Sequence, residues 1–101
     1  MGAISQKGAE FLVRSRIADA AAGDVDALFE LGVTYSTGQG GIAVDLIEAH
    51  KWFNLGALNG CTRSQSCRAE ISVEMTAREI AEAQRQARAW LGSTGYQRIA
   101  A

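Results

Sequence analysis

Three side chains in this sequence have the chemistry to act as a nucleophile, a base or a metal ligand: His50, Cys61 and Cys67. His50 is the only histidine, and the two cysteines are the only cysteines. Zinc sites need several converging ligands and typically pair cysteines or histidines at short spacings. These three residues lack such a spacing, so we expect no metal site and a solvent-facing His50 on a helix.

The two cysteines lie six positions apart in the sequence. On one helix this spacing places them about 9 Å apart along the axis, whereas the Cα atoms of a disulfide lie within ~7 Å of each other. The sequence therefore predicts two small buried thiols in a reducing compartment. A disulfide stays open as an alternative if residues 62–66 form a loop.

The glycine-rich run Gly38-Gln39-Gly40-Gly41 is the other pattern that suggests chemistry. A phosphate-binding P-loop requires a following lysine and a preceding strand, and neither is present, so we interpret the run as a turn between helices. A serine or cysteine nucleophile would need an adjacent base, and only His50 is a candidate. We therefore expect no catalytic residue and no cofactor.

Composition and charge limit the partners further. Apolar residues make up 48% of the 101 residues and charged residues 21%, as in ordinary globular domains, and the net charge is −1. This balance disfavours nucleic acid, whose binding needs a basic surface. No apolar run approaches the ~20 residues that cross a bilayer. We expect one domain over residues 1–101, with no membrane contact and a cytoplasmic location.

The elements that must position these side chains are all helices. Proline is absent, β-branched residues do not alternate, and Gly23, Gly38, Gly60 and Gly92 stand where helices would end in a left-handed cap. Apolar periodicity predicts five helices. The expected ranges are 9–22, 25–36, 46–59, 62–73 and 76–91, followed by a tail from residue 93.

Local signals support these helix boundaries. Asp24 and Asp45 are placed as N-caps, and Thr76 with Glu79 forms a capping box. Helix 46–59 is apolar on two faces and must be sandwiched between neighbours. Gly32 within helix 25–36 costs ~1 kcal/mol relative to alanine. We expect a neighbouring helix to approach closely there.

We expect a large side chain, Trp52 or Tyr35, to fill the space above Gly32. The substitution Gly32→Leu should then destabilise the fold by about 1–3 kcal/mol through overpacking.

An internal repeat organises the chain. Gly23 and Gly60 lie 37 positions apart, and each precedes a predicted helix pair. Residues 22–40 read AGDVDALFELGVTYSTGQG and residues 45–60 read DLIEAHKWFNLGALNG. About nine of these spaced positions agree with the Sel-1-like repeat, a relative of the tetratricopeptide repeat, and the segment 23–60 resembles that family. Two departures are visible: the glycine turn holds an extra residue, and residues 61–92 match poorly, as expected of a capping repeat.

The resemblance implies a fold and a function. The fold is a short right-handed α/α superhelix of about five antiparallel helices, and the function is that of a non-catalytic protein-interaction module or adaptor. Such solenoids bind partners on a concave face lined by the first helix of each pair. The residues of helix 25–36 turned away from its core stripe, our candidate partner-binding set, are Asp26, Glu30, Val33 and Thr34. Their acidity suggests a basic or amide-rich protein or peptide partner.

Two alternatives stay open at this point. The short array would allow copies to stack head to tail, because residues 1–61 carry a net charge of −3 and residues 62–101 a net charge of +2. Some cysteine-rich relatives of the family have been linked to β-lactam hydrolysis, although the two cysteines here lack the regular paired pattern of those relatives.

Overall fold

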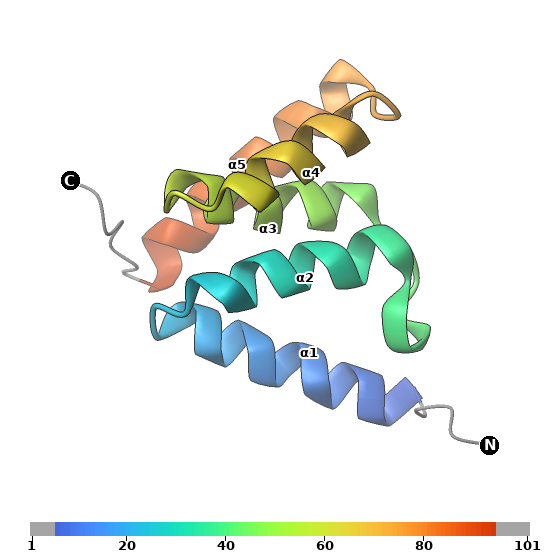
Figure 1. Cartoon of the computed structure of the whole chain (residues 1–101), viewed down its shortest axis with the longest axis vertical. Coiled ribbons are helices and arrows are strands. Elements are labelled where there is room, and N and C mark those ends of the chain that lie inside the picture. The colour runs from blue at the N-terminus through green and yellow to red at the C-terminus, as the bar shows by residue number, and fades with distance from the viewer. Residues whose placement is uncertain (1–5, 95–101) are drawn as a thin grey trace.

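The computed structural model describes residues 6–94, and within that range it holds five α-helices, one short 3-10 turn and no strand (Figure 1). The elements are α1 (Gln6–Ala21), α2 (Val25–Thr37), η1 (Gln39–Gly41), α3 (Leu46–Leu58), α4 (Thr62–Ser72) and α5 (Ala77–Thr94). The predicted all-α class and the five helices are confirmed. None of these helices is both long and apolar enough to span a membrane.

The helix boundaries follow from the capping signals. Asp24 accepts hydrogen bonds from the amides of residues 26 and 27, and Asp45 accepts one from the amide of Glu48 at 3.1 Å. In the capping box, the Glu79 amide donates to the Thr76 hydroxyl at 3.1 Å, and the Thr76 amide donates to the Glu79 carboxylate at 2.9 Å. These side chains satisfy amides that the first helical turn leaves unpaired.

Glycines end several helices, as the sequence predicts, with one exception. Gly23, Gly38 and Gly60 have φ values of 107°, 75° and 89°, in the left-handed region that a Cβ atom disfavours. The expectation for Gly92 is wrong, because α5 continues through it to Thr94. Helix α1 likewise begins at Gln6, earlier than the predicted residue 9. Of the expected tail, residues 95–101 lie outside the described range.

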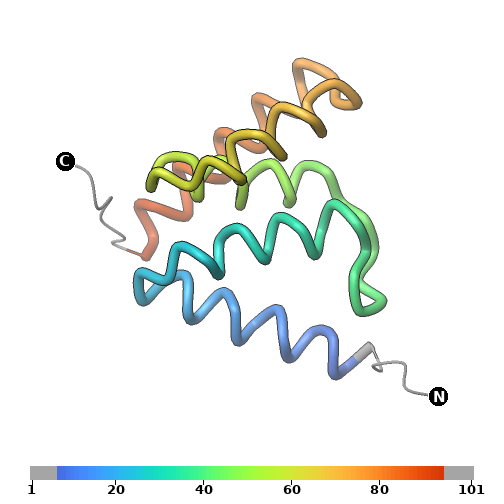
Figure 2. The backbone as a smooth tube through the Cα atoms, in the orientation of Figure 1, coloured from blue at the N-terminus to red at the C-terminus, as the bar shows by residue number. Residues whose placement is uncertain are grey.

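Helix α3 is the centre of the fold. Helices α2, α4 and α5 all pack against it, whereas α1 packs against α2 and η1 at one edge of the molecule (Figure 1). The tube in Figure 2 shows each helix turning back along the one before it. The predicted sandwiching of helix 46–59 is therefore confirmed, and it explains why that helix is apolar on two faces.

The core joins α2, α3 and α5, and α1 adds Val13 and Ala20 to it. Leu28, Leu31 and Leu55 are fully buried, and Trp52 is only 2% exposed. The Trp52 ring meets the Trp90 ring of α5 edge to face, with the centroids 5.3 Å apart. Burying each large apolar side chain contributes about 1.5–3 kcal/mol relative to exposure, so this cluster holds the three helices together.

Two helical glycines mark the closest approaches between helices. A Cβ atom on Gly32 of α2 would lie 2.8 Å from Cγ of Phe53 on α3, and one on Gly56 of α3 would lie 3.0 Å from Cβ of Ser64 on α4. The predicted close approach at Gly32 is confirmed. The residue that fills the space is Phe53, however, so the choice of Trp52 or Tyr35 was wrong.

Candidate functional site

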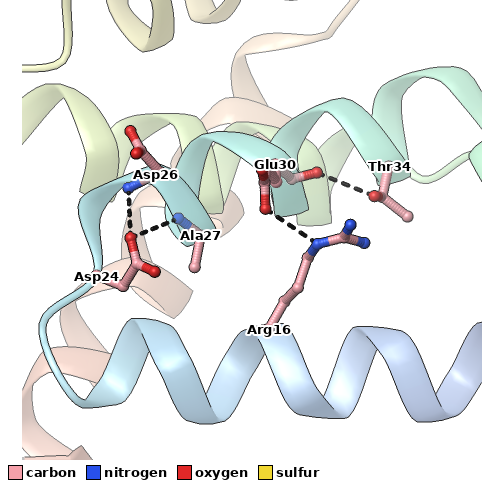
Figure 3. Close-up of polar contacts among 6 residues, drawn as sticks. All are labelled: Arg16, Asp24, Asp26, Ala27, Glu30 and Thr34. Atoms are coloured by element: carbon pink, nitrogen blue, oxygen red, sulfur yellow. Dashed lines mark hydrogen bonds and ion pairs between the residues drawn. The ribbon is translucent and has the colours of Figure 1, made fainter.

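Helix α2 presents the candidate partner-binding residues, and its two caps fix its position. At its start Asp24 Oδ1 accepts from the Asp26 amide at 3.0 Å and from the Ala27 amide at 3.3 Å (Figure 3). At its end Gly38 adopts the left-handed conformation and its amide donates to the Thr34 carbonyl at 2.9 Å. The segment between them packs its apolar face onto α1 and α3.

Thr34 does not face outward, and its inclusion in the outward set is wrong. The side chain is only 4% exposed, because Ala27, Leu31 and Thr34 form one stripe at helical spacing along the buried side of α2. Its hydroxyl donates to the Glu30 carbonyl at 2.9 Å within the same helix (Figure 3). That internal hydrogen bond lets a polar side chain be buried at little cost.

Asp26, Glu30 and Val33 lie on the remaining, outward side of α2. Asp26 and Glu30 are exposed and Val33 is half-buried. Glu30 accepts from Nε of Arg16 on α1 at 3.1 Å, so its charge is already paired (Figure 3). Exposed pairs of this kind contribute little stability. Of the acidic residues in the candidate set, Asp26 makes no ion pair within residues 6–94.

The other border of this outward side is formed by α4. The guanidinium of Arg63 lies 4.3 Å from the centre of the Phe29 ring, a cation–π contact between α4 and α2. The Phe29 ring in turn packs against Phe53 of α3, with the centroids 5.9 Å apart. We call the surface made by Asp26, Phe29, Glu30 and Val33 with Arg16 and Arg63 at its borders the α2 face.

A shallow groove of about 270 Å³ lies beside this face, where α1 and α2 diverge and η1 spans them. Its lining is mainly apolar and includes the buried Ala9 and Val13 of α1 together with Leu12 and Ile42. Arg16 and Thr34 also line it. The groove therefore offers apolar contact area and one cation, Arg16, that is already paired with Glu30.

The glycine-rich run after α2 forms the predicted turn. Gly38 ends the helix, and Gly40 and Gly41, both within the short 3-10 turn, have φ values of 71° and 89°. The Gly41 amide donates to the Gly38 carbonyl at 3.2 Å. The positive φ angles are therefore used to turn the chain between α2 and α3.

The two thiols are free, and α4 begins at Thr62 between them. The loop that would allow a disulfide is therefore absent from residues 62–66. Both thiols are half-buried, so the prediction of buried thiols is met only in part. Cys61 is the N-cap of α4, and its Sγ accepts from the Ser64 amide at 3.4 Å. Burial and the charge of Glu70 raise the pKa of Cys67, which keeps this thiol protonated and weakly nucleophilic.

His50 is buried, and the expected solvent-facing position is wrong. Only 3% of the residue is exposed. The sequence held a signal for this, since Leu46, His50, Phe53 and Ala57 follow one helical stripe on α3. Burial, and then the charge of Arg68, lower the pKa of the imidazole. Across residues 6–94 no group of three or more histidine, cysteine or acidic side chains is placed to hold a metal ion.

Comparison with known proteins identifies no relative: no family model, no curated protein and no solved structure matches the chain.

Proposed function

We propose that this chain is a protein-interaction module built as a short α/α solenoid of the Sel-1-like type, and that it binds a partner across the α2 face. The proposal is supported by the order of packing, in which α2 and α4 meet each other while α3 packs against both and against α5. This is the order expected when two successive helix pairs stack. The class of module is proposed because residues 23–60 resemble the Sel-1-like repeat.

The single observation that carries the binding proposal is the pairing of α2 with α4 at Phe29 and Arg63. The 4.3 Å contact joins the first helices of the two pairs into one surface. Solenoids of this kind recognise partners on the surface that their first helices share. Asp26 lies on this surface with an exposed carboxylate, so a cationic or amide-bearing side chain of the partner is the group we expect there.

The proposal is tested by reversing the charges of the α2 face. The double variant Asp26→Arg/Glu30→Arg should lose partners that the parent chain captures, as identified by mass spectrometry. The matched control is Asp19→Arg/Glu74→Arg, which changes the net charge by the same amount at exposed positions outside this face. Circular dichroism verifies that both variants remain helical. Equal capture by the two variants would contradict the binding face.

Self-association is a second candidate function, favoured by a specific observation on α1. Phe11 is 61% exposed and Leu12 is 40% exposed on this edge helix, which packs on α2 and η1. Exposed apolar residues at the edge of the described helices are what a second copy would cover. Sedimentation equilibrium of the parent chain and of Phe11→Glu separates the candidates. If both proteins are monomers, self-association is excluded and the interaction module remains the proposed function. If the parent chain is a dimer and Phe11→Glu is a monomer, self-association is supported.

The proposed module has no catalytic role. The remaining alternative is β-lactam hydrolysis. A turnover assay with a chromogenic β-lactam tests it, with Cys61→Ser and Cys67→Ser as controls. Turnover that disappears in either variant would overturn the non-catalytic proposal.

A further inference from the structure

Helix α3, against which α4 packs, holds the only histidine of the chain in a buried position. His50 is 97% removed from solvent, and its Nδ1 atom has no hydrogen-bond partner within the part of the chain that the structure describes. A neutral imidazole tolerates such a site with one nitrogen unprotonated. An imidazolium does not, because both nitrogens then carry protons and the buried charge is unsolvated.

Arg68 is the charged group that acts on this ring from α4. Its Nη1 atom donates to Oδ1 of Asn54 at 2.6 Å, one turn beyond His50 on the same side of α3. The guanidinium is thus held in the interface by a hydrogen bond that joins the two helices. Its charge opposes protonation of the imidazole, in addition to the larger effect of burial on the pKa of His50.

Within residues 6–94, no negative charge offsets a proton on His50. On the same helix, Glu48 Oε1 lies 2.7 Å from Nζ of Lys51, so these two charges pair with each other. The core cluster that α2 and α5 form with α3 includes Leu28, Leu31 and Ala87. Tyr35 of α2 packs against this cluster and stays neutral, because burial and then the charges of Glu48 and Asp45 raise its pKa. Among residues 6–94, Arg68 is the charged side chain that perturbs the imidazole, and it has the same sign as the imidazolium.

We propose that His50 makes the α3–α4 contact acid-sensitive: protonation of the imidazole places a second positive charge beside Arg68 in a buried interface and loosens α4 from α3. The folded protein favours the neutral imidazole, whereas the unfolded chain binds a proton at the ordinary histidine pKa of about 6.5. The stability that the buried neutral ring contributes is therefore complete above about pH 6.5, and it is lost as the pH falls towards the lower pKa of the folded protein. Since α4 carries Arg63, acid would also alter the α2 face, a consequence that rests on the proposed function.

The experiment needs no binding partner, so its failure and that of the proposed function are distinguishable. Amide hydrogen exchange is measured on the parent chain between pH 7.5 and pH 5, with each protection factor corrected for the intrinsic rate at that pH. Protection in α4 should fall by up to about tenfold per pH unit below about pH 6.5. Protection in α1, which packs on α2 away from the histidine, should fall less. Equal losses in α1 and α4, or no loss in α4, would overturn the proposal.

Two variants assign the effect to its source. His50→Gln keeps a neutral polar side chain and should abolish the acid-dependent loss in α4. Arg68→Gln removes the opposing charge and should raise the midpoint at which His50 titrates. If His50→Gln fails to fold, the pKa of His50 can still be measured by proton NMR of the parent chain. A single histidine gives a single imidazole C2-proton resonance, whose shift with pH reports the titration midpoint. A midpoint at or above about 6.5 would refute the mechanism.

Discussion

The contact between Gly32 and Phe53 gives the sharpest prediction about the fold. A Cβ atom at residue 32 would lie 2.8 Å from Cγ of Phe53 and closer still to Cδ1 and Cε1 of the same ring. Carbon atoms in contact prefer about 3.5–4.0 Å, so the overlap is roughly 1 Å. Phe53 is 1% exposed and also packs on Phe29, which leaves the ring little room to retreat. We expect Gly32→Ala to cost about 1–3 kcal/mol through overpacking.

Alanine has a higher intrinsic helix propensity than glycine, which stabilises any helical Gly→Ala variant. This gain must be separated from the overpacking cost at residue 32. Gly92 provides the matched control, because it lies within α5 and a Cβ atom there would meet no neighbour within 4 Å among residues 6–94. Gly92→Ala should therefore stabilise the fold by up to about 1 kcal/mol. The Gly32 variant should be less stable than the Gly92 variant by about 1–3 kcal/mol in urea unfolding, or roughly 4–20 °C in melting temperature.

A third variant shows whether the ring is the cause. Phe53→Leu shortens the side chain that the new methyl group would strike. In a double-mutant cycle, Gly32→Ala should cost less in the Phe53→Leu background than in the parent, with a coupling energy of about 0.5–3 kcal/mol. The reasoning is refuted if Gly32→Ala stabilises the parent as much as Gly92→Ala does, or if the cycle shows no coupling.

Three further substitutions probe α2 and α4. Asp24→Ala removes the acceptor for two amides and should lower the urea-derived free energy of unfolding by about 1 kcal/mol, whereas Asp24→Asn should largely preserve it. Cys61→Ser replaces a weak sulfur acceptor at the N-cap of α4 by a preferred hydroxyl and should raise the melting temperature; a lower one would contradict the capping role. Ser64→Ala removes a buried hydroxyl without a hydrogen-bond partner among residues 6–94, so unfolding should be unchanged or up to about 1 kcal/mol less favourable. A loss above about 1 kcal/mol would show that the hydroxyl is paired.

The elements that the sequence predicts well are those with local causes. The Asp24 and Asp45 caps and the Thr76–Glu79 box act within one helical turn, so their residue types suffice to locate the helix starts. Gly92 shows the limit of this reasoning. A glycine near a helix end is compatible with a cap, yet it stays helical where the following residues continue the helix.

The partner of a close approach could not be predicted from spacing alone. Gly32 indicates that another helix comes near, but the rotation of α3 about its own axis decides whether Trp52 or Phe53 faces that glycine. Trp52 turns instead to Trp90 on α5, and Phe53 turns to α2. That rotation is set by α2, α4 and α5 together, which is information that no single helix contains.

Thr34 and His50 are buried polar residues for which the sequence predicted an outward position, and their burial differs in its consequences. Each stands at helical spacing with apolar residues, so periodicity favoured burial over the preference of its residue type. Thr34 satisfies its hydroxyl through the Glu30 carbonyl of its own helix and carries no titratable group. His50 Nδ1 has no hydrogen-bond partner among residues 6–94, and the charge of Arg68 opposes protonation of the ring. Burial of the first is therefore independent of pH, whereas burial of the second holds only while the imidazole stays neutral.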